Sequence, residues 1–189
     1  AVFDTSSRMP ADKISYALNT RLPEDIRIQE SCEVPSDFHP RFQKTTKTYE
    51  YRILNRRFPD PTRRLNSFFY YYPLDVAKMQ EASLYLVGEH DFKSFCTEKP
   101  EVTNTVRTIY SLNVIKEGDM IIIRVTGNGF LYNMVRIIAG TLIRVGGGFI
   151  EPQQIKKILE AKDRTLAGET ARPEGLTLIG ISYGGEIQG

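Results

Sequence analysis

The residue best suited to chemistry is Arg136, which lies in an otherwise almost entirely apolar stretch from Gly129 to Gly140. A guanidinium stays protonated at any physiological pH, so its burial requires a carboxylate or a phosphate partner. The sequence contains no Asp or Glu between Asp119 and Glu151. A carboxylate partner for Arg136 must therefore come from elsewhere in the fold or from outside the chain. The alternative is that the side chain extends along its aliphatic stem to reach water.

Tyr49 is the second candidate, because it lies in a basic part of the chain on a stretch that alternates like a β-strand. A tyrosine in such a place can stack on an unpaired base, and its hydroxyl group can form hydrogen bonds or exchange a proton. The alternative is that Tyr49 and Tyr51 are core aromatic residues of a half-buried strand.

The segment from Arg41 to Arg64 is strongly basic, with eight basic and two acidic residues in a chain whose net charge is only +2. A basic segment on a slightly acidic body is typical of proteins that bind a polyanion such as nucleic acid. A solvated basic surface is the alternative. The candidate substrate contacts are the following basic residues: Arg41, Lys47, Arg56, Arg57, Arg63 and Arg64.

Composition excludes several classes of protein. Hydrophobic residues make up 41% of the chain and charged residues 25%, which predicts a folded protein rather than a disordered one. No apolar run approaches the length of a membrane span, so we expect no membrane contact and a cytoplasmic protein. Cys32 and Cys96 are far apart and accompanied by only two histidines, so we expect two buried thiols and no metal site. No hydrolase or nucleotide-phosphate motif is present.

The pattern of apolar residues predicts an α+β fold, with helices and strands interspersed and one antiparallel hairpin. We expect helices over 10–18, 75–87, 129–146 and 152–161, and strands over 25–34, 47–54, 106–115, 120–126 and 176–183. The opening residues 1–5 are strand-like but lack an initiator Met, so the chain is expected to be a fragment. We expect residues 1–42 to be the remnant of one subdomain and residues 43–189 to form a second.

Several motifs of the chain, in order, resemble those of the tRNA pseudouridine synthase A family. They are Phe38–Phe42, Lys47–Ile53, Gly88–Phe95, Gly129–Arg136, Ala161–Arg164 and Ala171–Leu176. The resemblance implies the pseudouridine synthase fold, a mostly antiparallel mixed sheet flanked by helices, here with an incomplete N-terminal subdomain. It also implies an isomerase that uses no cofactor, acts on uridines in the anticodon stem-loop of tRNA and is a homodimer in its full-length form.

The resemblance further implies roles for three residues. Tyr49 matches a tyrosine that stacks on the flipped uracil, Arg136 an arginine that pairs with the catalytic carboxylate, and Leu176 a leucine that lines the base pocket. The family's nucleophilic Asp lies in a Gly-Arg-Thr-Asp motif, which is absent from this sequence, and neither Asp4 nor Asp12 matches it. We therefore expect the chain to be inactive alone. A non-catalytic RNA-binding module or a structural, oligomerising domain is the alternative.

Overall fold

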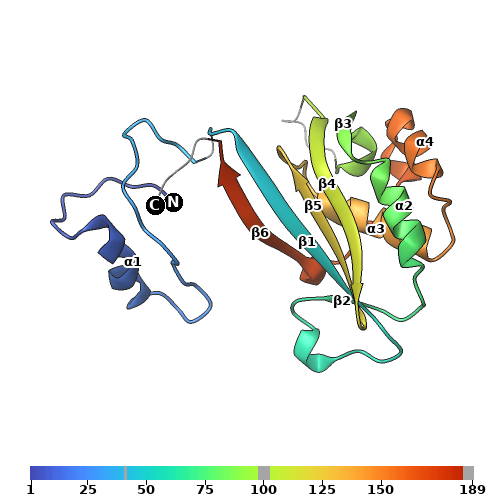
Figure 1. The fold of residues 1–189 in the computed structure, drawn as a ribbon, viewed down its shortest axis with the longest axis horizontal. Coiled ribbons are helices and arrows are strands. Elements are labelled where there is room, and N and C mark those ends of the chain that lie inside the picture. Colours follow the sequence, from blue (N-terminus) through green and yellow to red (C-terminus); the bar gives the residue numbers. More distant parts are fainter. Residues whose placement is uncertain (41, 98–102, 185–189) are drawn as a thin grey trace. The chain divides into compact units, whose positions relative to one another are not determined.

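The computed structural model describes residues 1–40, 42–97 and 103–184 (Figure 1). The chain divides into two compact units: residues 1–44 together with the end of the chain from Tyr183, and residues Thr45–Ser182. Among the described residues, the second unit contains all the β-structure except the last residue of the final strand, and three of the four α-helices. One predicted contact residue, Arg41, lies outside the described residues.

The first unit contains the helix α1 (Ala11–Asn19), as predicted, and its described part holds no strand residue other than Tyr183. The prediction of a strand over 25–34 is wrong, because this segment bonds to side chains of α1 and not to another strand. The Asn19 amide donates to the Ile28 carbonyl oxygen and accepts from the Ile28 N–H, both at 2.8 Å. The strand-like opening over residues 1–5 is likewise irregular.

A six-stranded mixed sheet forms the centre of the second unit. Its strands run in the order β2 (Phe68–Tyr70), β1 (Thr45–Asn55), β5 (Met120–Gly127), β4 (Val106–Glu117) and β3 (Gly88–Asp91). The final strand β6 (Leu176–Tyr183) also pairs with β1. Strands β1 and β2 pair in parallel, whereas the pairs β1–β5, β5–β4 and β4–β3 are antiparallel. The predicted hairpin over 106–126 is therefore confirmed.

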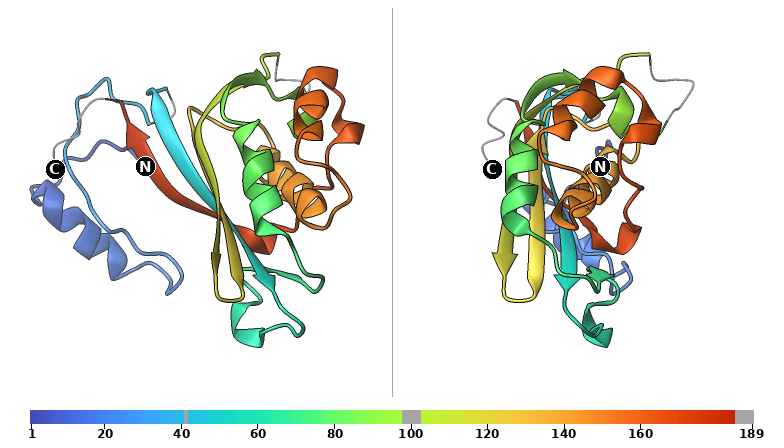
Figure 2. Two further views of the ribbon diagram at one scale, coloured as in Figure 1. Left: turned by 45° about the vertical axis from the view of Figure 1, so that its right-hand side comes forward. Right: turned by 90° about the vertical axis from the view of Figure 1, so that its right-hand side faces the viewer.

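Three helices cover one face of this sheet (Figure 2): α2 (Val76–Leu84), α3 (Met134–Gly146) and α4 (Gln154–Ala161). Strand alternation explains the sidedness, because Tyr51 and Ile53 are fully buried on the helix-covered face while Glu50 and Arg52 point to the other. The α+β class is thus confirmed. Within the described residues, no helix combines the length and apolarity that a membrane crossing requires. Cys96 is buried as predicted, but Cys32 is exposed.

Helix α3 is the most buried helix of the unit, with eleven of its thirteen residues buried. The two exceptions are Arg136 and Arg144. The helix starts five residues later than predicted, because Asn133 adopts the left-handed conformation (φ 61°) and therefore cannot continue a right-handed helix. The segment before Asn133 is a turn that connects β5 to α3 and passes the predicted site.

Candidate functional site

A hollow of about 200 Å³ lies where β1 meets the start of α3. It is lined by Tyr49 on β1, Arg136 on α3, Leu176 at the start of β6, and residues 130–135, which form the turn and the first two positions of α3. These three residues are far apart in the sequence, and the structure brings them together. They are the three residues to which the resemblance assigns roles in catalysis or base binding.

Tyr49 forms one wall of the hollow and is held there by an aromatic neighbour. Its ring meets that of Phe130 edge to face, with ring centroids 5.3 Å apart and an interplanar angle of 86°. Pairing with Val125 of β5 fixes its position along the sheet. No hydrogen bond involves the Tyr49 hydroxyl group within the described residues, so this group can bind a substrate. Lys47 lies two residues before Tyr49, on the same face of β1.

Arg136 is half-buried and makes two hydrogen bonds to neutral oxygen atoms. Its Nε donates to the Ala171 carbonyl oxygen at 2.7 Å, and its Nη1 donates to Asn133 Oδ1 at 3.1 Å. No acidic side chain contacts it in the part of the chain that the structure describes. Because a guanidinium has five N–H donors, three remain for an anion or a substrate oxygen.

Asn133 is a site residue that the sequence prediction did not include. Besides accepting from Arg136, its side chain donates to Thr97 Oγ1 at 3.2 Å. Asparagine tolerates the left-handed backbone required here better than most residues do. The Asn therefore ends the turn, begins α3 and fixes one side of the guanidinium. The sequence did hold a signal for this residue: Asn133 is a polar side chain three residues before Arg136 in an otherwise apolar stretch.

The carbonyl group of Ala171 reaches Arg136 because the segment 168–172 lies directly against α3. The Ala171 N–H donates in turn to the Arg136 carbonyl oxygen at 3.1 Å. This close approach requires glycine: a Cβ on Gly140 would lie 1.9 Å from the Glu169 carbonyl oxygen. A Cβ on Gly168 would likewise overlap the backbone of Thr141. Backbone packing, which periodicity does not reveal, therefore positions the second partner of Arg136.

Tyr51 holds the other end of the same segment. Its hydroxyl group donates to the Arg172 carbonyl oxygen at 2.7 Å, and its ring packs where a Cβ on Gly175 would lie. Burial, together with the negative charge of Glu174, raises the pKa of Tyr51 well above its ordinary value. Tyr51 therefore stays protonated and holds in place the segment that leads to Leu176, whereas Tyr49 lines the hollow.

Comparison with known proteins agrees with this geometry. A model described as tRNA pseudouridine synthase matches residues 82–184, which include Arg136 and Leu176. Proteins named tRNA pseudouridine synthase A are similar over nearly the whole chain. The one from Thermoanaerobacter sp. (strain X514) is 47% identical over 183 residues, covering 97% of this chain and 75% of that protein. The one from Bacillus subtilis (strain 168) is 46% identical, covering 96% and 73%.

The chain belongs to the tRNA pseudouridine synthase A family. Its α+β sheet with helices on one face is consistent with the pseudouridine synthase fold that the resemblance implied. Among the described residues, no group of three or more His, Cys, Asp or Glu side chains is arranged to hold a metal ion.

The predicted basic residues do not gather around the Tyr49 hollow of this family member. Arg56 and Arg57 line a second hollow near the end of β1. Arg63 and Arg64 lie in or next to a short 3-10 turn (Pro61–Arg63), where Arg63 pairs with Asp60 at 3.7 Å. Among the predicted cations that the structure describes, only Lys47 lies on the same strand as Tyr49. The sequence placed these cations in one segment but could not reveal that they are spread over β1 and the loop that follows it.

A buried carboxylate on the opposite face of the sheet belongs to neither hollow. Glu50 is 3% exposed and receives two hydrogen bonds each from Arg52 and Arg124, at 2.6–3.1 Å. Burial alone would raise the pKa of Glu50, but the hydrogen bonds and charges of Arg124 and Arg52 outweigh it and lower the pKa. This cluster ties β1 to β5 and is a structural feature.

Proposed function

We propose that this protein isomerises uridine to pseudouridine in tRNA, with the anticodon stem-loop as the region modified and the Tyr49 hollow as the uracil site. The convergence of Tyr49, Arg136 and Leu176 on one hollow supports this proposal most directly. In the reaction the C1′–N1 glycosidic bond breaks, the uracil turns, and a C1′–C5 bond forms. C5 loses its proton, and N1, which carried the broken bond to C1′, gains a proton.

Each of the three residues has a role that its chemistry supports. Tyr49 stacks on the extruded uracil, since a base must leave the helical stack before a protein can act on it. Leu176 contributes an apolar wall. Arg136 binds and orients the carboxylate that attacks the sugar, because its remaining N–H groups match a carboxylate in geometry and charge. A half-buried guanidinium also strengthens the electrostatic field at the reacting atoms.

We propose that this 189-residue chain has no synthase activity alone, because its sequence contains no Gly-Arg-Thr-Asp motif and hence no matching nucleophile. The measurement is tritium release from tRNA labelled at uridine C5, with a protein-free reaction as the blank. Release at the level of the blank is the expected result. Release above it would require another acid, such as Asp4, to be the nucleophile.

The chain by itself would then act as an RNA-binding module, the alternative function. We propose that its basic residues (Arg41, Lys47, Arg56, Arg57, Arg63 and Arg64) contact tRNA phosphates. Binding would be weak and would decrease steeply with salt concentration, because each neutralised phosphate releases counterions. A titration of tRNA at several salt concentrations tests this. Affinity that does not change with salt, or no binding at low salt, would contradict it.

We also propose that the full-length protein is a homodimer and acts in the cytoplasm. The resemblance to the family supports both statements. If the full-length protein is a homodimer, light scattering during size-exclusion chromatography will give twice the mass of one chain. A mass equal to one chain at micromolar concentration would contradict it.

A further inference from the structure

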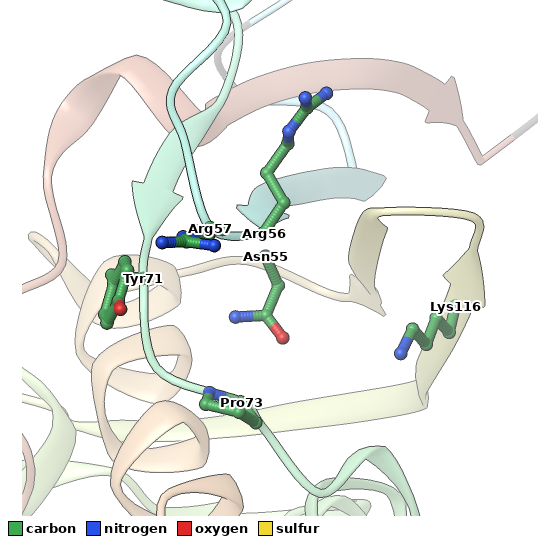
Figure 3. Close-up of a pocket in the computed structure, with 6 residues that line it drawn as sticks. All are labelled: Asn55, Arg56, Arg57, Tyr71, Pro73 and Lys116. Atoms are coloured by element: carbon green, nitrogen blue, oxygen red, sulfur yellow. The ribbon is translucent and has the colours of Figure 1, made fainter.

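A second hollow, of about 380 Å³, lies at the end of β1 where the chain leaves the sheet. It is lined by Asn55, Arg56, Arg57, Tyr71, Pro73 and Lys116 (Figure 3). Tyr49 and Asn55 are six residues apart on one strand, which places this hollow about 20 Å from the proposed uracil site. The two hollows share no lining residue.

Two of the three cations at this hollow have no acidic partner among the described residues. Arg56 pairs with Asp119 at 3.5 Å. Arg57 instead lies over the ring of Phe58, with its Cζ atom 5.1 Å from the centroid, and Lys116 forms no ion pair with any residue that the structure describes. In Figure 3 the guanidinium of Arg57 lies on the side of Tyr71, and the Lys116 ammonium points toward Asn55. The hollow therefore has an uncompensated positive charge.

Asn55 makes the walls of this hollow rigid. Its Nδ2 donates to the carbonyl oxygens of Tyr70 and Tyr72 at 2.9 and 2.7 Å, and its Oδ1 accepts from the Leu74 N–H at 3.3 Å. Its own N–H donates to the Asp119 carbonyl oxygen at 2.8 Å. One residue, through its side chain and its backbone N–H, thus joins three segments: the end of β1, the 70–74 stretch and the β4–β5 turn. A site fixed before binding loses little entropy when a ligand enters.

Tyr71 adds an exposed aromatic ring to these cations. It is 53% exposed, and its ring meets that of Tyr72 edge to face with centroids 5.2 Å apart. Cations that bind phosphate next to an aromatic ring that stacks on a base or ribose are the combination that single-stranded nucleic acid requires. An acidic peptide would satisfy the cations but would make no use of the ring.

We propose that this hollow binds one nucleotide of the tRNA outside the reacting uridine, with the phosphate at Arg57 and Lys116 and the base or ribose against Tyr71. The inference rests on the proposed function, because it presumes that tRNA is the substrate. It assigns Lys116 and Tyr71, which lie outside the basic segment, to RNA binding. It also separates two tasks: the Tyr49 hollow holds the uracil, and this hollow holds the backbone at a distance.

The test compares tRNA binding by the 189-residue chain with that of Arg57→Gln, Lys116→Gln, Tyr71→Ala and the control Lys156→Gln, an exposed cation on α4. Each of the first two should weaken binding about tenfold, as expected for one charge-assisted hydrogen bond. Each should also reduce the slope of log K against log salt by about one. Tyr71→Ala should weaken binding at least about fivefold without changing the slope. Tyr71→Phe should bind like the unchanged chain.

A thermal melt of each variant checks that it is folded, and we expect all of them to fold because the replaced side chains are exposed. If the unchanged chain binds tRNA while Arg57→Gln, Lys116→Gln and Tyr71→Ala all bind like Lys156→Gln, the nucleotide site is overturned and the proposed function stands. If the unchanged chain fails to bind tRNA at low salt, the proposed RNA-binding function is overturned as well. A loss with Tyr71→Ala that Tyr71→Phe shares would overturn the stacking role alone.

Discussion

The guanidinium of Arg136 is oriented by two neutral oxygen atoms, those of Ala171 and Asn133. Neutral acceptors fix the plane of the group without neutralising its charge, so its attraction for an incoming carboxylate is preserved. The sequence showed that no acid lies nearby in the chain. It could not show that a carbonyl group 35 residues later in the chain would be one of the two partners.

Asn133 provides a test of this orientation. We expect Asn133→Gly to retain the left-handed backbone and lose both side-chain hydrogen bonds, and Asn133→Ala to lose the bonds and add backbone strain. Thermal or urea unfolding should therefore show the Ala variant to be less stable than the Gly variant by about 1 kcal/mol. Both variants should be equally impaired in binding RNA at the Tyr49 hollow. Equal stability of the two would contradict the strained backbone.

Glu50 leads to a prediction about pH. Its pKa is lower in the folded chain than in the unfolded chain, so its ionisation stabilises the fold above the ordinary Glu pKa. That contribution is lost as pH falls through the lowered folded value. Glu50→Gln should therefore reduce the free energy of unfolding at pH 7 by about 1.5–3 kcal/mol, the range for hydrogen bonds to charged groups. The difference between the two proteins should shrink in strongly acidic solution.

Urea unfolding of both proteins at pH 7 and in a series of acidic buffers measures this difference. The Glu50→Gln change lies on the face of the sheet opposite the helices, so tRNA affinity at pH 7 serves as a control and should stay nearly constant. A difference in stability that is independent of pH would show that packing, rather than charge, is the contribution of Glu50.

Helix α3 and the segment 168–172 fix the site as a pair of elements. Gly140→Ala places a Cβ where the Glu169 carbonyl oxygen lies, so the two must separate and Ala171 must withdraw from Arg136. We expect a loss of about 3 kcal/mol, at the upper end of the usual cost of overpacking. Gly180→Ala on β6 is the matched control, because its Cβ would meet nothing within 4 Å. Similar stability of the two variants would contradict the close contact.

The alternation of apolar residues along the chain predicted the longer strands of the main sheet correctly. It could not show which segments lack a neighbouring strand to pair with. Tyr49, Tyr51 and Ile53 alternate on β1 as the sequence indicated, and the hairpin of β4 and β5 follows from two β-rich runs around a glycine turn. The alternation of Ile26 and Ile28 was equally regular, yet that segment bonds to α1. A strand requires a partner, and periodicity carries no information about partners.

At the scale of the whole molecule, the family could be predicted because its motifs are in order along the chain, and the same motifs contain the three residues that meet at the Tyr49 hollow. The second hollow could not, since Lys116 reaches it only through the pairing of β5 with both β1 and β4. The 189 residues span about three quarters of the length of the Thermoanaerobacter relative.

Cross-linking tests the central claim most directly. The chain would be mixed with tRNA that contains 4-thiouridine in the anticodon stem-loop, irradiated, and digested, and the linked peptides identified by mass spectrometry. If the Tyr49 hollow is the uracil site, the linked peptides will contain Tyr49 and residues 130–136, and an excess of unlabelled tRNA will abolish them. Cross-links confined to other parts of the chain would contradict the account.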